Sequence, residues 1–254
     1  MPVMDEFKEE REALKNAPLK DKIKYFWCYY KWHTFAVIVA IAIVISLANT
    51  FLSYKETGFY AAFINTLPAA RTSEECAEEF GNLTGIDMKE YQVVFDTNMF
   101  IDMDRMDEGT VANTQKMMVY IAAGDLDMVV TDTASLRHYA YQESFVDLTT
   151  ILTPEQQKKY EPYYYYIDRK LSQEIKQASE DLDNEYVPVY PADPFDPTSM
   201  EDPVPVGVCM DSCTKLKNDF RFRDGNVVLS IVTSAKHKEL AVQYLEYVFE
   251  EPTN

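Results

Sequence analysis

Histidine and serine are the side chains that hydrolytic enzymes most often use as base and nucleophile, and histidine is scarce in this chain. The three histidines are His33, His138 and His237, and none lies in an HExxH zinc motif. The sequence also lacks the GxSxG motif of serine hydrolases. A triad or a zinc site would have to assemble histidines from unrelated places, and we expect His138 and His237 on exposed helix faces. We therefore predict that the chain is not an enzyme and uses no cofactor.

An acidic run at residues 102–109 (DMDRMDEG) invites comparison with a calcium-binding EF-hand loop. Counted from Asp102, that loop needs an oxygen ligand at position 5, glycine at position 6 and glutamate at position 12. Met106, Asp107 and Asn113 occupy these positions. The spacing excludes an EF-hand, so we expect no metal and interpret the run as a solvated loop that caps the following helix.

Two of the four cysteines, Cys209 and Cys213, are close enough in the sequence to close a small disulfide loop. Such a disulfide would stabilise the fold modestly, because the loop is short. The alternative is that these two residues and Cys76 all remain thiols. A zinc site would need a second close pair of cysteine or histidine ligands, and the sequence offers none.

Four consecutive tyrosines, residues 163–166, follow Tyr160. Aromatic rings of this kind stack on sugars or anchor protein interfaces. At helical spacing Tyr160 and Tyr164 would share one face, and the alternative interpretation is that this face packs into the core.

The balance of charge excludes nucleic acid as a partner. The chain has 24 basic and 42 acidic side chains, a formal net charge of −18, whereas affinity for nucleic acid comes mainly from lysine and arginine on phosphates. The seven glycines are too scattered to form a GxGxxG or P-loop motif, so phosphate-cradling loops are absent as well.

One segment, Thr34 to Tyr54, contains no charged side chain. As a helix it would be about 30 Å long, which matches the hydrocarbon core of a bilayer. A cleaved signal peptide usually has a shorter apolar region behind a short basic start, whereas 33 residues precede this segment. We therefore predict a cytoplasmic segment at 1–33, a transmembrane helix at 34–54 that contacts the lipid bilayer, and an extracytoplasmic domain at 55–254.

The distribution of charge orients this helix. Residues 1–33 carry seven lysines and arginines, and the stretch just after the helix carries only Lys55 and Arg71, so the positive-inside rule places the N-terminus in the cytoplasm. The aromatic run YFWCYYKW before the helix is typical of a membrane-interface belt. It also resembles the juxtamembrane start of many single-pass membrane proteins from Gram-positive anaerobes (Clostridia and relatives). From Lys55 onward the chain carries 17 basic and 36 acidic side chains, a net charge of −19, so the acidity belongs to the outer part.

The elements of residues 55–254 alternate between strand and helix. We expect strands at 59–65, 91–96, 126–131, 187–190, 204–209 and 227–233. We expect helices at 73–83, 110–123, 134–141, from Pro154 onward, at 168–182 and at 236–250. This alternation predicts an α/β fold, with a mainly parallel sheet covered by helices on both faces.

Small hydrogen-bonding side chains follow several of the expected strands. Ligands of open parallel sheets gather at the carboxyl ends of the strands. The predicted ligand-binding residues there are Asn65, Thr66, Thr97, Asn98, Thr131, Asp132 and Ser234. They suit a small polar, neutral ligand such as a sugar, and they are equally common as helix caps.

The run IAAGDLDMVVTD (Ile121–Asp132), with SFVDLTTIL after it, resembles the first lobe of extracellular solute-binding proteins of the type 2 periplasmic-binding fold. The segments Val204–Ser212 and Val227–Phe249 resemble the elements that return to that lobe. The resemblance implies a solute-binding domain, but the family binds its ligands between two lobes and 200 residues suffice for only one. We therefore expect a reduced, one-lobed relative that binds a small polar ligand. The alternative is an interaction scaffold for an extracytoplasmic protein partner that has lost small-ligand binding.

Overall fold

The computed structural model describes residues 18–52, 55–105, 107–180 and 186–249, and the chain divides into two units, residues 1–54 and 55–254. The described part of the first unit is helix α2 (Leu19–Leu52), which has 34 residues. Residues 1–17 of the expected cytoplasmic segment and residues 53–54 of the expected membrane span lie outside the described residues. The helix begins well before residue 34, so the aromatic segment that precedes the apolar run is helical too.

Helix α2 carries apolar side chains that nothing in the described chain covers. From Lys31 to Asn49 it is long and apolar enough to cross a membrane, and none of that window is buried. Val44, for example, keeps 63% of its surface exposed. The helix of a signal sequence passes the same test of length and composition.

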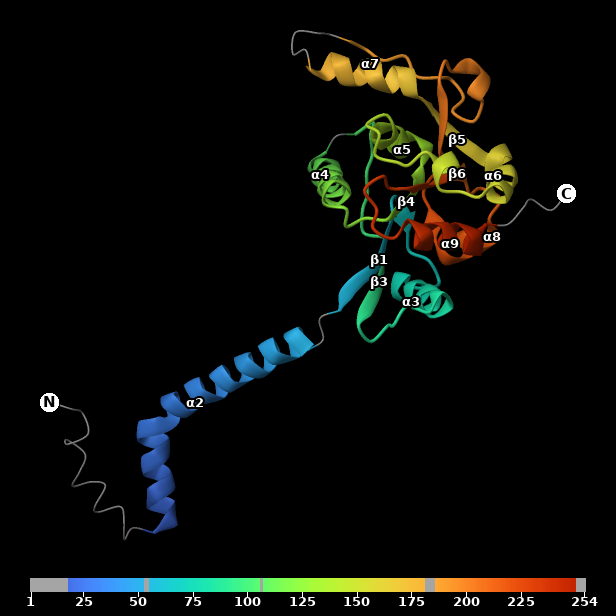
Figure 1. Cartoon of the computed structure of the whole chain (residues 1–254). Coiled ribbons are helices and arrows are strands. Elements are labelled where there is room, and N and C mark those ends of the chain that lie inside the picture. The colour runs from blue at the N-terminus through green and yellow to red at the C-terminus, as the bar shows by residue number, and fades with distance from the viewer. Residues whose placement is uncertain (1–17, 53–54, 106, 181–185, 250–254) are drawn as a thin grey trace. The chain divides into compact units, whose positions relative to one another are not determined.

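The second unit is built on a six-stranded sheet (Figure 1). Across the sheet the strands lie in the order β3 (Tyr91–Asp96), β1 (Glu56–Phe63), β4 (Met128–Asp132), β8 (Val227–Ile231), β6 (Pro203–Cys209) and β5 (Tyr164–Asp168). A second, two-stranded sheet pairs β2 (Thr66–Leu67) with β7 (Arg221–Phe222). The α/β class is therefore confirmed.

The sheet is mixed, which corrects the expectation of a mainly parallel one. Strand β1 is parallel to both β3 and β4, because the chain returns through a helix before each new strand. Strand β8 is antiparallel to β4, β6 is antiparallel to β8, and β5 is antiparallel to β6. The carboxyl ends of β1, β3 and β4 consequently share one edge of the sheet, and the end of β8 lies at the opposite edge.

Helices cover both faces of the sheet, as the sequence predicts. They are α3 (Ser73–Thr84), α4 (Glu108–Ala123), α5 (Thr133–Ala140), α6 (Pro154–Tyr160), α7 (Arg169–Glu180), α8 (Thr214–Asp219) and α9 (Lys238–Val248), with 3-10 turns η1 (Leu148–Thr150), η2 (Glu161–Tyr163) and η3 (Pro197–Ser199). Alternation along β1 feeds two cores: Phe59 and Phe63 pack with α3, α8 and α9, whereas Ala62 and Ile64 pack with α4 and α5. Burial on both faces explains the consecutive apolar residues 61–64 at the end of β1 and 128–130 in β4.

The tyrosine run differs from its expected helical form. Residues 164–166 belong to β5, so Tyr164 and Tyr166 face one core and Tyr165 faces the other. The strand expected at 187–190 is absent, and this segment is extended chain without strand pairing. His138 and His237, expected on exposed faces, are half-buried.

Candidate functional site

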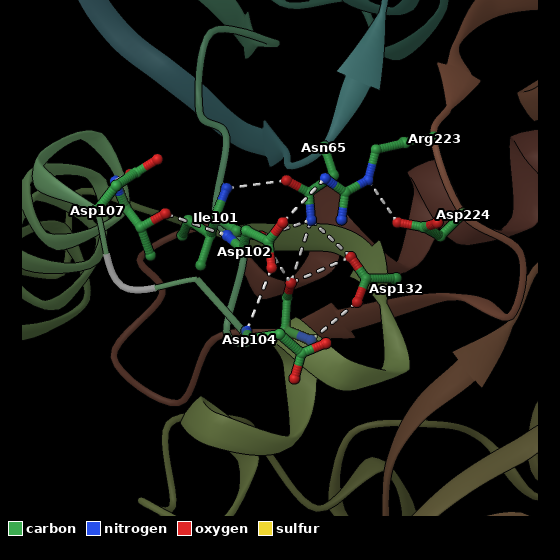
Figure 2. Close-up of polar contacts among 10 residues, drawn as sticks. Asn65, Ile101, Asp102, Asp104, Asp107, Asp132, Arg223 and Asp224 are labelled. Atoms are coloured by element: carbon green, nitrogen blue, oxygen red, sulfur yellow. Dashed lines mark hydrogen bonds and ion pairs between the residues drawn. The ribbon is translucent and has the colours of Figure 1, made fainter.

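Asn65 is the centre of a buried polar cluster at the edge where β1 and β4 end (Figure 2). Its side-chain nitrogen donates to the Ile101 carbonyl at 2.8 Å and to Oδ2 of Asp132 at 2.7 Å. Its side-chain oxygen accepts a hydrogen bond from the Ile101 amide at 2.8 Å, and its backbone amide donates to the Met99 carbonyl at 3.0 Å. Asn65 adopts a φ of 59°, a left-handed conformation that asparagine tolerates better than most residues. These hydrogen bonds hold the segment after β3, which contains Met99 and Ile101, against the carboxyl end of β1.

Asp132 completes this cluster and begins helix α5. Its Oδ1 accepts from the Ser135 amide at 2.9 Å, which makes it the N-cap of α5. Its Oδ2 accepts from the Ser135 hydroxyl at 3.1 Å and from the Thr131 hydroxyl at 3.4 Å, in addition to Asn65. Asn65, Thr131 and Asp132 are 2%, 0% and 8% exposed. Three of the predicted ligand-binding residues therefore bond to one another and to the backbone in this structure.

Charged side chains surround the cluster on its outer side (Figure 2). The guanidinium of Arg223 lies 3.3 Å from Asp102 and 2.7 Å from Asp224, and its backbone amide donates to the Asn65 carbonyl at 2.9 Å. Asp107 caps α4 by accepting from the Thr110 amide, a hydrogen bond that lowers the pKa of its carboxyl group. The acidic run thus pairs with arginine and caps a helix, and the described residues contain no group of three or more ligands suited to a metal.

The other strand-end residues on this edge line an open groove of about 360 Å³. Thr66, Thr97 and Asn98 form one side of it, and the segment from Leu67 to Glu74, with Asp219 and Phe220, forms the rest. The Thr66 hydroxyl donates to the Thr97 carbonyl at 3.1 Å, and the Asn98 amide donates to Asp96 Oδ1 at 2.9 Å. We call it the strand-end groove, and it is the accessible part of the predicted ligand-binding site.

The guanidinium of Arg71 lies in the strand-end groove but is already paired. It contacts Glu79 and also Asp219, the latter at 2.6 Å, and its pKa is raised mainly by the hydrogen bond to Glu79. Asp219 itself is buried. The groove therefore presents hydroxyl and amide groups, the exposed carboxylate of Glu74 and a neutralised arginine, an arrangement that disfavours an anion and suits a polar ligand that donates hydrogen bonds.

Asp96, at the end of β3, was not among the predicted residues, although its position after a strand was the available signal. Burial raises the pKa of its carboxyl group, but hydrogen bonds from Lys116 at 2.8 Å, from the Asn98 amide and from Tyr60 at 2.8 Å outweigh burial and lower it. Lys116 belongs to α4 and Tyr60 to β1. The carboxylate therefore holds α4 on the sheet and fixes the backbone of Asn98 at the rim of the strand-end groove.

Ser234 does not lie at the same end of the sheet as the other six predicted ligand-binding residues, which corrects the prediction that all seven form one site. Because β8 is antiparallel to β4, residue Ile231 pairs with Met128 at the start of β4, and Ser234 lies beyond it. Its hydroxyl donates to the Ile121 carbonyl. His237, close by in the sequence, has its Nδ1 3.2 Å from the buried Asp127. Since the serine proton is committed to a carbonyl, this serine, histidine and aspartate are not arranged as a nucleophile and its base.

Cys209 and Cys213 carry thiols and are not joined by the suggested disulfide. Val208 and Met210 both belong to the core that contains Cys213, so strand alternation points Cys209 to the opposite face of the sheet. Burial is the largest cause that raises the pKa of the Cys209 thiol, and it likewise raises that of Cys76, to about 11. Low reactivity is therefore expected for both thiols.

The strand-end edge combines a closed, internally bonded cluster with an adjoining open groove. The cluster can position the groove but offers no accessible acid, base or nucleophile of its own. The groove can hold a ligand by hydrogen bonds.

Comparison with known proteins adds no relative: no family model, no curated protein and no solved structure matches the chain.

Proposed function

We propose that the chain is a single-pass membrane protein whose extracytoplasmic domain, residues 55–254, binds a small polar ligand without transforming it. The observation that carries this proposal is the strand-end groove, which brings together Thr66, Thr97 and Asn98 from the segments that follow the parallel strands β1 and β3. Its volume of about 360 Å³ falls within the range of small-molecule pockets. Ligands of open α/β sheets bind at such carboxyl ends.

The membrane anchor in this proposal is helix α2. A helix that is apolar on all sides has to be buried in protein or in lipid, and the described residues supply no protein cover for it. The seven basic side chains before the apolar run favour a cytoplasmic N-terminus. Trp27 and Trp32, 66% and 72% exposed, stand where interfacial aromatic side chains are common.

The proposed ligand is a neutral polar molecule such as a sugar, because the one cation in the lining of the groove is paired with Glu79 and Asp219. The domain would then be a reduced, one-lobed relative of the type 2 periplasmic-binding proteins. This assignment is supported by the residues that resemble that family and by the α/β sheet with helices on both faces.

A second candidate function is an interaction scaffold, favoured by the closed cluster of Asn65, Thr131 and Asp132. These side chains form hydrogen bonds with one another, and the remaining groove is open to solvent. A small ligand usually has most of its surface buried when it binds. A groove this open also suits a protein partner that covers its exposed side.

A thermal-shift and calorimetric titration of the full chain in phospholipid nanodiscs, with neutral monosaccharides and disaccharides as probes, tests the proposal. We expect at least one probe to raise the melting temperature. Asn98→Ala should remove that effect, because Asn98 lines the groove. The control is Asn82→Ala, an exposed asparagine in α3 outside the groove, which should leave it intact. The absence of any shift, together with co-purification of one fixed protein, would favour the scaffold.

A further inference from the structure

A second groove, of about 370 Å³, lies around the first residues of β5, the outermost strand on the side of the sheet away from β3. Its lining comes from η1, α6, η2, β5 and β6: Thr149, Pro154, Gln157, Lys158, Glu161, Tyr164, Tyr166 and Pro205. We call it the tyrosine groove. Strands β1 and β5 are separated by three others, which places the two grooves roughly 20 Å apart across the sheet. The tyrosine groove is therefore independent of the strand-end groove.

Tyr164 provides the observation that points to a ligand. Its side chain is only 4% exposed, and within the described part of the chain its hydroxyl has no hydrogen-bond partner. A buried polar group without a partner costs free energy, so such groups in native proteins call for an explanation. The pKa of this phenol is raised to about 12, mainly by burial and to a lesser extent by Tyr166 and Glu161, which both line the groove. Tyr164 itself lines the groove, so its unpartnered hydroxyl belongs to a side chain at the groove surface.

The lining of the tyrosine groove has an apolar part and a polar part, and we call the polar part, Thr149, Gln157, Lys158 and Glu161, the rim. The rings of Tyr164 and Tyr166 stand nearly perpendicular, with centroids 5.9 Å apart, and Tyr166 is half-buried, so part of its surface reaches solvent. Pro154 and Pro205 extend the apolar surface. Gln157 is held in place because its amide donates to the carbonyls of Thr149 and Leu152 at 2.9 and 2.8 Å.

The charges of the rim select the kind of ligand. Lys158 and Glu161 offset each other, so the lining is neutral within a domain of net charge −19. An anion or a cation would gain little from it. The rim offers both donors and acceptors, and Glu161 needs a donor from its ligand. A proline-rich peptide supplies mainly acceptors, whereas a sugar hydroxyl supplies both.

From this arrangement we infer that the tyrosine groove binds a neutral sugar unit of an oligosaccharide. The apolar face of the ring lies on Tyr166, one hydroxyl reaches the Tyr164 hydroxyl, and further hydroxyls bond to Glu161 and Lys158. The groove is open, so neighbouring units of the oligosaccharide can continue into solvent.

The test is calorimetric titration of the full chain in phospholipid nanodiscs, which avoids sugar-based detergents. The probes are cellotriose, maltotriose and the trimer of N-acetylglucosamine, each up to about 10 mM, so that a complex with a dissociation constant of about 1 mM is still detected. A peptide with the chain's own sequence VPVYPADPFDP (residues 187–197) is the competing probe. Binding of at least one trisaccharide is expected.

Two matched variants separate ligand binding from folding. Tyr164→Phe removes only the hydroxyl, and Tyr160→Phe removes the other unpartnered tyrosine hydroxyl of this region, which is buried but does not line the groove. Neither change should lower the melting temperature, because each removes a buried hydroxyl that forms no hydrogen bond and therefore does not stabilise the fold. Tyr164→Phe should weaken trisaccharide binding about 3- to 10-fold, the worth of one hydrogen bond, while Tyr160→Phe leaves it unchanged.

Tyr166 tests the stacking surface. Tyr166→Ala should reduce affinity more than tenfold, and Tyr166→Phe, which keeps the ring, should retain most of it. The inference is overturned if none of the trisaccharides binds, if Tyr160→Phe weakens binding as much as Tyr164→Phe, or if only the peptide binds. Loss of binding in Asn98→Ala with normal binding in Tyr164→Phe would also overturn it, and would assign the sugar to the strand-end groove instead.

Discussion

Replacement of Asn65 gives the sharpest test of the closed cluster, because glycine and alanine separate its two roles. Asn65→Gly keeps the left-handed backbone at φ 59° but deletes the side chain. The lost bonds are one to the Asp132 carboxylate at 2.7 Å, two to the backbone of Ile101 at 2.8 Å and one to the Ser135 hydroxyl at 3.2 Å. A bond to a charged group is worth about 1.5–3 kcal/mol, and buried backbone groups left without a partner cost about 1–3 kcal/mol. We expect Asn65→Gly to cost about 4 kcal/mol.

Asn65→Ala should cost more, because alanine in the left-handed region adds about 1–2 kcal/mol. In thermal unfolding followed by near-ultraviolet circular dichroism, a domain of this size loses roughly 2–4 °C per kcal/mol. Asn65→Gly should therefore melt roughly 8–16 °C lower than the parent chain, and Asn65→Ala lower still. Equal melting temperatures of Asn65→Gly and Asn65→Ala would refute the left-handed backbone conformation of residue 65. If both melted like the parent, Asn65 would be free of the internal bonds and available to a ligand.

Three further predictions concern a helix end, acid stability and topology. Gly124→Ala should lower the free energy of unfolding in urea by about 2–3 kcal/mol, because the glycine has φ +67° and an added Cβ would lie 2.8 Å from the Ser234 carbonyl oxygen. The control Gly225→Ala adds its Cβ in open space and should be near neutral. Equal losses in the two variants would contradict this reasoning. Hydrogen bonds from Tyr247 and then Arg71 lower the pKa of Glu79 from 4.5 to about 2, so its stabilising contribution is present above pH 4.5 and lost as the pH falls toward 2. Glu79→Gln should therefore flatten the decline in melting temperature over that interval, and an unchanged decline would count against the pairing. Alkaline phosphatase is active only in an oxidising compartment, so a fusion after Asn254 should be active if the C-terminal domain lies outside the cell. An inactive fusion of normal abundance would contradict the proposed orientation.

The local elements were predictable because their signals are local. Strand β3 has the predicted bounds of 91–96, and α3 and α4 end within one residue of the predicted ends at 83 and 123, each followed by a glycine with positive φ, Gly85 and Gly124. Strand β5 was missed because four identical residues show no alternation of polar and apolar side chains. Helix α8 was missed because its six residues are too few to reveal a helical period.

The accessibility of the site was not predictable from the same signals. The strand-end rule brought Asn65, Thr97 and Asp132 to one edge, because it needs only the direction of β1, β3 and β4. Whether each side chain faces solvent depends on the chain after β3, which crosses the edge and bonds to Asn65 from 36 residues away. No periodicity within one element carries that information.

The direction of β8 was also not predictable from the sequence, and the wrong placement of Ser234 is the consequence. The apolar run 227–233 reads identically in either direction, so the sequence pattern could not distinguish a strand parallel to β4 from an antiparallel one. The chain reaches β8 through the short helix α8 and strand β7 rather than through a crossover that would return it parallel, and the antiparallel pairing of Val227 with Asp132 follows. The start of β8, not its end, therefore meets the strand-end cluster. The neighbouring loop delivers Arg223 to Asn65 and Asp102 there, a role that a wholly parallel sheet would have assigned to Ser234.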